Sequence, residues 1–85
     1  MNMTHLGFLA VKRGDHQEAV NIFKRALEQR KDADAFFGFG VAHYHLGDFA
    51  TARWAFNKAL ELNHGQSEAR DYLGRIERSQ QQTPP

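Results

Sequence analysis

The chain of 85 residues contains no cysteine, and its only two prolines stand at the C-terminal end. Without cysteine the protein can form no disulfide bond, no thiolate metal site and no cysteine nucleophile. No hydrophobic run approaches the roughly 20 residues that a membrane-spanning helix requires. The chain also lacks an excess of either charge, because its 11 basic residues nearly balance its 10 acidic residues. The formal net charge of +1 therefore offers no general attraction to nucleic acid or to an anionic membrane.

What the chain does contain is an internal repeat. The segment Gly14–Ala19 (GDHQEA) returns 33 positions later as Gly47–Ala52 (GDFATA), and Phe23–Glu28 (FKRALE) returns as Phe56–Glu61 (FNKALE). A period of this length indicates one supersecondary unit stacked on copies of itself, in which neighbouring copies bury each other's apolar faces. Such an architecture is expected to present a surface rather than to carry out chemistry.

Apolar residues recur at steps of three and four along the chain, as in the series Ala19, Val20, Phe23, Ala26 and Leu27. This spacing is typical of amphipathic helices, and no useful stretch alternates with the period of two that strands show. We therefore predict an all-α fold with five helices, over about residues 2–13, 17–30, 34–46, 50–63 and 67–80.

Glycine and aspartate mark the predicted helix ends. Gly14 and Gly47 can take the left-handed conformation that ends a helix, and Asp15 and Asp48 follow them as candidate N-caps. Glu18 stands three residues after Asp15, which is the spacing of a capping box.

The spacing of these residues resembles that of the tetratricopeptide repeat family. The family's pattern is a bulky residue, Leu-Gly and an aromatic residue, followed later by alanine, an aromatic residue, alanine and proline. The first copy supplies Met3, Leu6-Gly7, Ala10, Ala19, Phe23 and Ala26, and the second supplies Phe36, Phe39-Gly40, Tyr44 beside His43, Ala52, Phe56 and Ala59. The resemblance covers about residues 1–78. It implies antiparallel helix-turn-helix repeats stacked as a short right-handed superhelix.

This resemblance divides the chain into a single repeat domain and a short tail. The expected parts are a domain over 1–80, with repeat one at 1–32, repeat two at 33–66 and a capping helix at 67–80, and a disordered tail over 81–85. In each repeat a glycine, Gly7 or Gly40, is small where two helices must approach closely. A phenylalanine, Phe23 or Phe56, is expected to fill the remaining volume of the core.

The start of the chain bears on its location. The first residues lack the basic start and the small-residue cleavage site of a signal peptide, so we expect a cytoplasmic protein. Met1 falls almost at the start of a repeat. The sequence therefore leaves open whether this chain is a complete protein or a piece of a longer repeat protein.

In the family, the first helix of each repeat lines a concave surface that holds ligands. By that resemblance, the expected partner-binding residues are apolar anchors and polar orienting groups, namely Phe8, Phe37, Val41, Tyr44, Tyr72, His5, Lys12, His45 and Arg75. Phe8 and Phe37 are not required by the pattern of the repeat's own core, which favours an exposed binding strip. The alternative is that some of these rings pack against neighbouring helices.

A protein or peptide is therefore the expected partner, and the expected role is that of a scaffold or adaptor. The family's clamp of lysines and asparagines for a C-terminal carboxylate is not evident, because Thr4, Phe8 and Gly38 hold the corresponding positions. A groove with apolar anchors better suits an amphipathic helix or an extended apolar peptide. The alternative function is homo-oligomerisation, as a homodimer, through the same apolar aromatic surface.

No metal site, cofactor or catalytic site is expected. His43 and His45 point roughly 200° apart on a helix, and no third ligand accompanies His5 and His45 in the groove. There is no phosphate-cradling glycine loop, and no grouping of serine, histidine and carboxylate has a recognisable spacing. We accordingly expect a protein that is not an enzyme and has no nucleic-acid partner.

Overall fold

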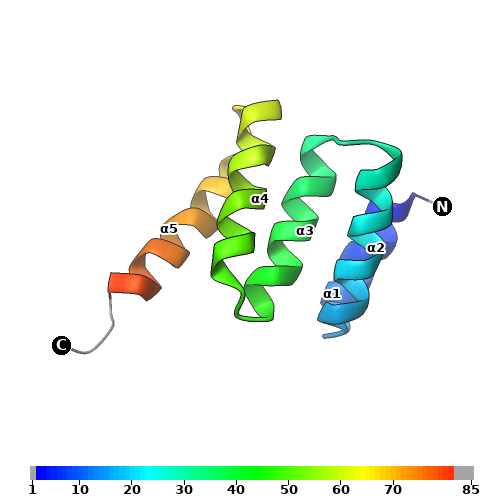
Figure 1. The fold of residues 1–85 in the computed structure, drawn as a ribbon, viewed down its shortest axis with the longest axis horizontal. Coiled ribbons are helices and arrows are strands. Elements are labelled where there is room, and N and C mark those ends of the chain that lie inside the picture. The colour runs from blue at the N-terminus through cyan, green and yellow to red at the C-terminus, as the bar shows by residue number, and fades with distance from the viewer. Residues whose placement is uncertain (1, 82–85) are drawn as a thin grey trace.

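The computed structural model describes residues 2–81, the side chain of Gln81 excepted, and folds them into five α-helices. They are α1 (Met3–Lys12), α2 (His16–Gln29), α3 (Ala33–His45), α4 (Phe49–Leu62) and α5 (Ser67–Gln81) (Figure 1). This described part of the chain holds no strand, so the predicted all-α fold is confirmed. Each helix begins and ends within one residue of its predicted bounds.

The predicted tail begins one residue too early. Gln81 was expected in the disordered segment 81–85 but is the last residue of α5. Glutamine is among the better helix formers, so the polar end of the chain does not by itself stop the helix. The rest of the predicted tail, 82–85, lies outside the described residues.

The helices pack mainly against their neighbours in the sequence. Contacts join α1 to α2, α2 to α3, α3 to α4 and α4 to α5, and a further contact joins α1 to α3. Figure 1 shows α2 and α4 running in the same direction, with their C-terminal ends at one end of the molecule. Helix α3 is central, because it is covered by α1 and α2 on one side and by α4 on the other.

The two glycine turns have the predicted backbone conformation. Gly14 and Gly47 both have φ of +84°, and no other described residue has a positive φ. A Cβ atom added at either position would meet nothing within 4 Å. Glycine is therefore favoured at these turns by the backbone conformation and not by lack of space.

The two aspartates that follow these glycines behave differently. Asp48 caps α4 as predicted, because its Oδ1 accepts a hydrogen bond from the Thr51 backbone N–H at 3.2 Å. Asp15 holds the matching position before α2 but makes no side-chain cap hydrogen bond. Its carboxylate lies 3.7 Å from Arg13 Nε instead. Asp15 thus occupies the predicted N-cap position of α2, but the side-chain hydrogen bond expected of an N-cap is absent.

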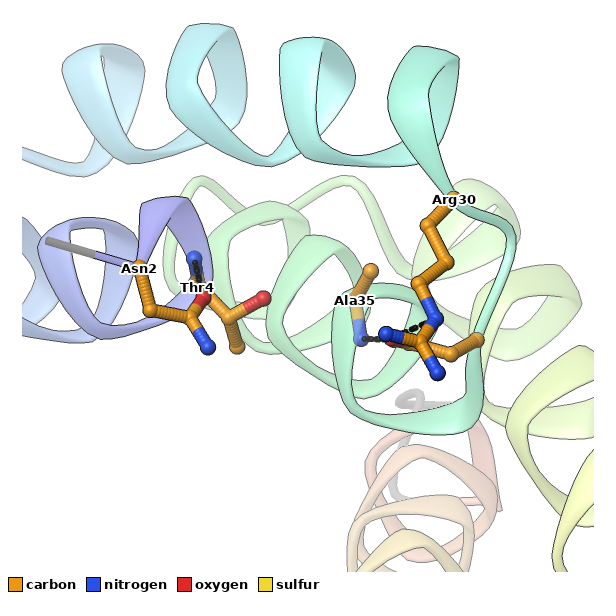
Figure 2. Close-up of polar contacts among 5 residues, drawn as sticks. Asn2, Thr4, Arg30 and Ala35 are labelled. Atoms are coloured by element: carbon orange, nitrogen blue, oxygen red, sulfur yellow. Dashed lines mark hydrogen bonds and ion pairs between the residues drawn. The ribbon is translucent and has the colours of Figure 1, made fainter.

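Two further caps lie near one another at the starts of α1 and α3 (Figure 2). Asn2 Oδ1 accepts a hydrogen bond from the Thr4 N–H at 2.8 Å, and Asp32 Oδ1 accepts one from the Ala35 N–H at 2.9 Å. Arg30 Nε stands 3.7 Å from Asp32 Oδ2. These caps fix the starting points of two of the three helices that line the groove described below, each contributing about 1 kcal/mol.

The core of each repeat is built around one phenylalanine and one glycine. Phe23 and Phe56 are both fully buried. A Cβ at Gly7 would lie 2.5 Å from the Phe23 ring, and one at Gly40 would lie 2.8 Å from the Phe56 ring. The predicted close approach at both glycines is confirmed.

Helix α5 closes the second repeat. Its residues Ala69 and Ile76 are fully buried, whereas Arg70 and Glu77 are exposed. This division matches the predicted packing side and solvent side of a capping helix. Among the described residues, no helix combines the length and the apolar character needed to cross a membrane.

Candidate binding groove

Helices α1, α3 and α5 bound an open groove of ≈ 600 Å³, which we call the α1/α3/α5 groove. Its lining residues are His5, Phe8, Leu9, Val11, Lys12, Phe37, Val41, His45, Glu68 and Tyr72. Seven of the nine predicted binding residues belong to this set, and Tyr44 and Arg75 do not. The structure thus brings together most of the residues that the sequence placed in a common groove.

Tyr44 and Arg75 adjoin the groove through Tyr72. The Tyr44 and Tyr72 ring centroids are 5.1 Å apart in an edge-to-face arrangement. The Arg75 Cζ atom lies 4.8 Å from the centroid of the Tyr72 ring, which is the geometry of a cation–π interaction. Tyr72 is therefore held between two neighbours that the sequence had assigned to the lining itself.

The expectation that the core does not need Phe37 is wrong. Phe37 is only 8% exposed and Val41 only 5%, and both belong to the hydrophobic core of the second repeat. The Phe37 ring centroid is 5.8 Å from that of Phe56 and 5.9 Å from that of Tyr72. The cause is the central place of α3, because both of its sides are covered by neighbouring helices. These two residues form the floor of the groove rather than exposed anchors.

Phe8 is half-buried and links the two cores. Its ring stands edge-to-face on Phe23, with the centroids 5.0 Å apart, and its centroid is 6.0 Å from that of Phe37. The alternative that some of the predicted rings pack against neighbouring helices thus holds in part for Phe8 and fully for Phe37. The accessible aromatic surface of the groove comes from the exposed parts of Phe8 and Tyr72.

Gly38 does not lie at the groove, although the sequence placed it among the inward positions. It is buried, and a Cβ added there would collide with the Phe23 ring from the side of α3. The Phe23 ring thus lies against Gly7 of α1 and Gly38 of α3. Glycine at position 38 is therefore required by the packing of Phe23. An asparagine there, as in the family's carboxylate clamp, would not fit.

The polar groups of the groove are solvent-exposed and mostly cationic or neutral. His5, Lys12, His45 and Glu68 are all exposed. Partial desolvation of the ring is the main cause that lowers the pKa of His45, followed by the neighbouring His16 and by Arg75. His45 is consequently uncharged at neutral pH, where it can both donate and accept a hydrogen bond.

Three residues near the groove were not found from the sequence. The His16 ring stacks on the His45 ring, with centroids 4.7 Å apart and planes inclined by 16°. Leu9 and Glu68 belong to the lining. Glu68 is in the first turn of α5, and that turn's proximity to α1 depends on tertiary packing that the repeat spacing does not contain.

The histidines do not assemble into a metal site in the described part of the chain, where no group of three histidine, aspartate or glutamate side chains has the required proximity. His43 Nδ1 lies 3.2 Å from Asp48 Oδ2, so this partly buried histidine is engaged by the carboxylate that caps α4. The Thr51 side chain and backbone N–H, and to a smaller extent His43, hold the pKa of Asp48 below its usual range.

Comparison with known proteins agrees with the geometry. A family model described as the tetratricopeptide repeat matches residues 6–67, which run from within α1 through α4 to the first residue of α5. A comparison with curated proteins gave no match. Helical repeats of this kind are typically non-catalytic interaction modules.

Proposed function

Because the chain belongs to the tetratricopeptide repeat family, whose members generally mediate protein–protein interactions, we propose that it is a scaffold or adaptor that holds a peptide or helix of a partner protein in the α1/α3/α5 groove. The proposed module covers residues 1–80, with repeat one at 1–32, repeat two at 33–66 and the capping helix at 67–80. The proposal assigns the protein no cofactor and no catalytic step.

One observation carries this proposal, namely the layering of the groove. The floor, Phe37 and Val41, is buried, while Phe8 and Tyr72 each keep part of their rings accessible. Lys12 and His45 stand exposed at the rim. An apolar centre surrounded by polar groups is the usual anatomy of a protein-binding site, in which half-buried aromatic rings anchor a partner and the rim orients it.

A rim variant tests the proposal without disturbing the fold. We expect His5→Ala combined with Lys12→Glu to weaken severalfold the affinity for a partner captured with the unaltered chain, because both side chains are exposed in the groove. Isothermal calorimetry would give the affinities, and far-UV circular dichroism should show unchanged helicity. Lys24→Glu is the matched control, since it makes the same charge reversal at an exposed position of α2 outside the groove.

Equal affinity for the unaltered chain and the rim variant would remove the α1/α3/α5 groove as the binding site. Phe37→Ala is unsuitable for this purpose. Truncating a buried phenylalanine costs about 3–5 kcal/mol of folding free energy, so a loss of binding could simply reflect unfolding.

Homo-oligomerisation is the second candidate function, and one observation favours it. Leu6 and Leu9 of the terminal helix α1 are each 36% exposed, so α1 keeps apolar surface that another helix could cover. Sedimentation velocity over a wide concentration range tests this candidate. A protein that stays monomeric at the highest concentration is not a homodimer, and a Leu6→Gln, Leu9→Gln variant that still dimerises would place the contact elsewhere.

A further inference from the structure

A second apolar depression lies away from the groove, near the start of α3, and is lined by residues of α2, α3 and α4 and of the α2–α3 connection. Its volume is ≈ 480 Å³, and it shares no lining residue with the α1/α3/α5 groove. We call it the Trp54 hollow, and its lining residues are Leu27, Lys31, Phe36, Trp54, Lys58, Glu61 and Leu62.

The apolar part of the Trp54 hollow has a buried floor and exposed walls. Phe36 is buried, whereas Trp54 is 50% exposed and Leu62 is 55% exposed. The Trp54 ring stands edge-to-face on Phe36, with the centroids 5.6 Å apart. The largest aromatic side chain of the protein is therefore held in a defined orientation while half of its surface remains open to a ligand.

The repeat itself does not require these exposed apolar residues. The position of Trp54 corresponds in the first repeat to Asn21, 33 residues earlier, and that of Leu62 corresponds to Gln29. Both first-repeat residues are polar and exposed on α2. That helix therefore forms without an apolar side chain at either position. Large exposed apolar side chains that packing does not demand are characteristic of interaction sites.

The charges around the hollow favour a partner that carries a carboxylate. Lys58 Nζ lies 3.8 Å from Glu61 Oε1, so these two rim charges largely offset each other. Lys31 has no carboxylate within ion-pair distance among residues 2–81. The rim therefore keeps one uncompensated positive charge beside the apolar walls.

The size of the hollow favours a short segment over a second copy of the chain. A half-exposed aromatic ring and a half-exposed leucine together offer roughly 200 Å² of apolar surface. A stable protein–protein interface buries about 800 Å² on each partner. One or two side chains of a peptide, in contrast, can be accommodated by a depression of this volume.

We propose that the Trp54 hollow is a second binding site, which takes a short peptide segment with one or two bulky apolar side chains next to a carboxylate. The apolar side chains lie against Trp54, Leu62 and the Phe36 floor. The carboxylate pairs with Lys31. A protein with both this site and the groove can contact a partner on two separate surfaces.

Trp54 is the only tryptophan of the chain, so its fluorescence reports directly on the hollow. The probes are three blocked seven-residue peptides with two central leucines, flanked by glutamate, by glutamine or by lysine. We expect the glutamate-flanked peptide to shift the Trp54 emission and to bind about fivefold tighter than the glutamine-flanked one, as a partly exposed ion pair allows. The lysine-flanked peptide should bind most weakly.

Two variants make the experiment specific. Lys31→Glu should reverse the order of the glutamate- and lysine-flanked peptides, and Trp54→Ala should abolish binding measured by the anisotropy of a labelled peptide. Trp54 is half-exposed, so Trp54→Ala should retain helicity by circular dichroism. His5→Ala with Lys12→Glu in the groove should leave peptide binding unchanged, which separates this site from the groove.

Three results would overturn the proposal. The first is the absence of any emission shift or anisotropy change with all three peptides. The second is equal affinity for all three flanks, which would remove the role of Lys31. The third is concentration-dependent dimerisation that Trp54→Ala abolishes, which would make a second copy of the chain the occupant of the hollow.

Discussion

The Tyr72 ring of α5 stacks on the Phe56 ring of α4, with the centroids 5.1 Å apart and the planes inclined by 15°. This contact joins the capping helix to the aromatic centre of the second repeat. Tyr72 also meets Phe37 and Tyr44 of α3 edge-to-face, so its ring joins α5 to both α3 and α4. Together with the buried Ala69 and Ile76, Tyr72 therefore holds α5, and with it one wall of the groove, in place.

Removing the Tyr72 ring should therefore loosen α5. We expect Tyr72→Ala to lower the free energy of unfolding by about 2 kcal/mol, somewhat less than the loss of a fully buried ring. Tyr72→Phe keeps every ring contact, so its free energy of unfolding should be close to that of the unaltered protein. Urea denaturation measures both variants, and equal stability of Tyr72→Ala and Tyr72→Phe would show that the stacking does not hold α5.

Two glycines in helix interiors should respond in opposite ways to a methyl group. Gly38→Ala places a Cβ against the buried Phe23 ring and should destabilise the protein by about 1–3 kcal/mol through overpacking. At Gly74 the nearest neighbour of a Cβ is the flexible end of Arg78, 3.4 Å away. Gly74→Ala should consequently be neutral or stabilising by up to about 1 kcal/mol, through better helix propensity.

Thermal unfolding followed by circular dichroism distinguishes the two glycine variants. A Gly38→Ala protein as stable as Gly74→Ala would contradict the close packing of α3 on Phe23. The comparison is internally controlled, because both substitutions add the same methyl group inside a helix.

The two matched aspartates provide a test of helix capping. Asp48→Ala removes a hydrogen bond to the Thr51 N–H and should cost about 1 kcal/mol. Asp15→Ala removes only an exposed contact with Arg13 and should cost a few tenths of a kcal/mol. Urea denaturation of both variants would show the difference, and a larger loss at Asp15 would contradict the assigned caps.

The groove should make stability depend on pH. The pKa of His45 lies below its ordinary value of 6.5 because burial, His16 and Arg75 disfavour the protonated form. The unfolded chain therefore binds this proton more readily than the folded chain does. Stability at this site is complete above about pH 6.5 and declines as the pH falls from that value through the lowered pKa.

His45→Gln should remove the part of the decline that begins near pH 6.5, whereas His64→Gln, at an exposed position outside the groove, should retain it. A second decline at more acidic pH should remain in both variants. There the carboxyl of Asp48, whose pKa is lowered from 3.8, takes up its proton and loses its favourable contacts. Melting temperatures from pH 3 to pH 8 test both steps, and an unaltered profile in His45→Gln would contradict the assignment.

Local sequence signals predicted the helices well, because they depend on neighbours in the chain. The steps of three and four, together with Gly14 and Gly47, determine where the helices end. The exception is the side-chain hydrogen bond expected between Asp15 and the start of α2, which does not form. The residue before its glycine, Arg13, offers Asp15 an ion pair, whereas the matching residue before Gly47 is the apolar Leu46.

The sequence predicted most of the residues that line the groove, but it did not predict how deeply each of them is buried. His5, Gly38 and Tyr72 hold the same place in successive repeats, yet the first is exposed, the second buried and the third half-buried. Their differences come from the place of each helix in the stack. The repeat period alone does not show which helix is central and which helices lie at the ends of a short stack, so it does not predict these differences in burial.

The Trp54 hollow was not predicted because the family resemblance places ligands on the first helix of each repeat, whereas Trp54 lies on α4, the second helix of its repeat. Its signal was nevertheless present in the differences between the copies. Asn21 and Trp54 are matched positions, as are Gln29 and Leu62, and each pair exchanges a polar residue for a large apolar one. Only the structure shows that these replacements meet at one place on the surface.

The Phe23 ring, lodged between Gly7 of α1 and Gly38 of α3, has a consequence for how the molecule can be divided. The side chain belongs to the first repeat by sequence, but Gly38 of the second repeat forms part of the wall around it. A cut in the connection between α2 and α3 would pass through the centre of a packing unit rather than between two. We therefore expect the pair of repeats to fold together and to unfold as one cooperative block.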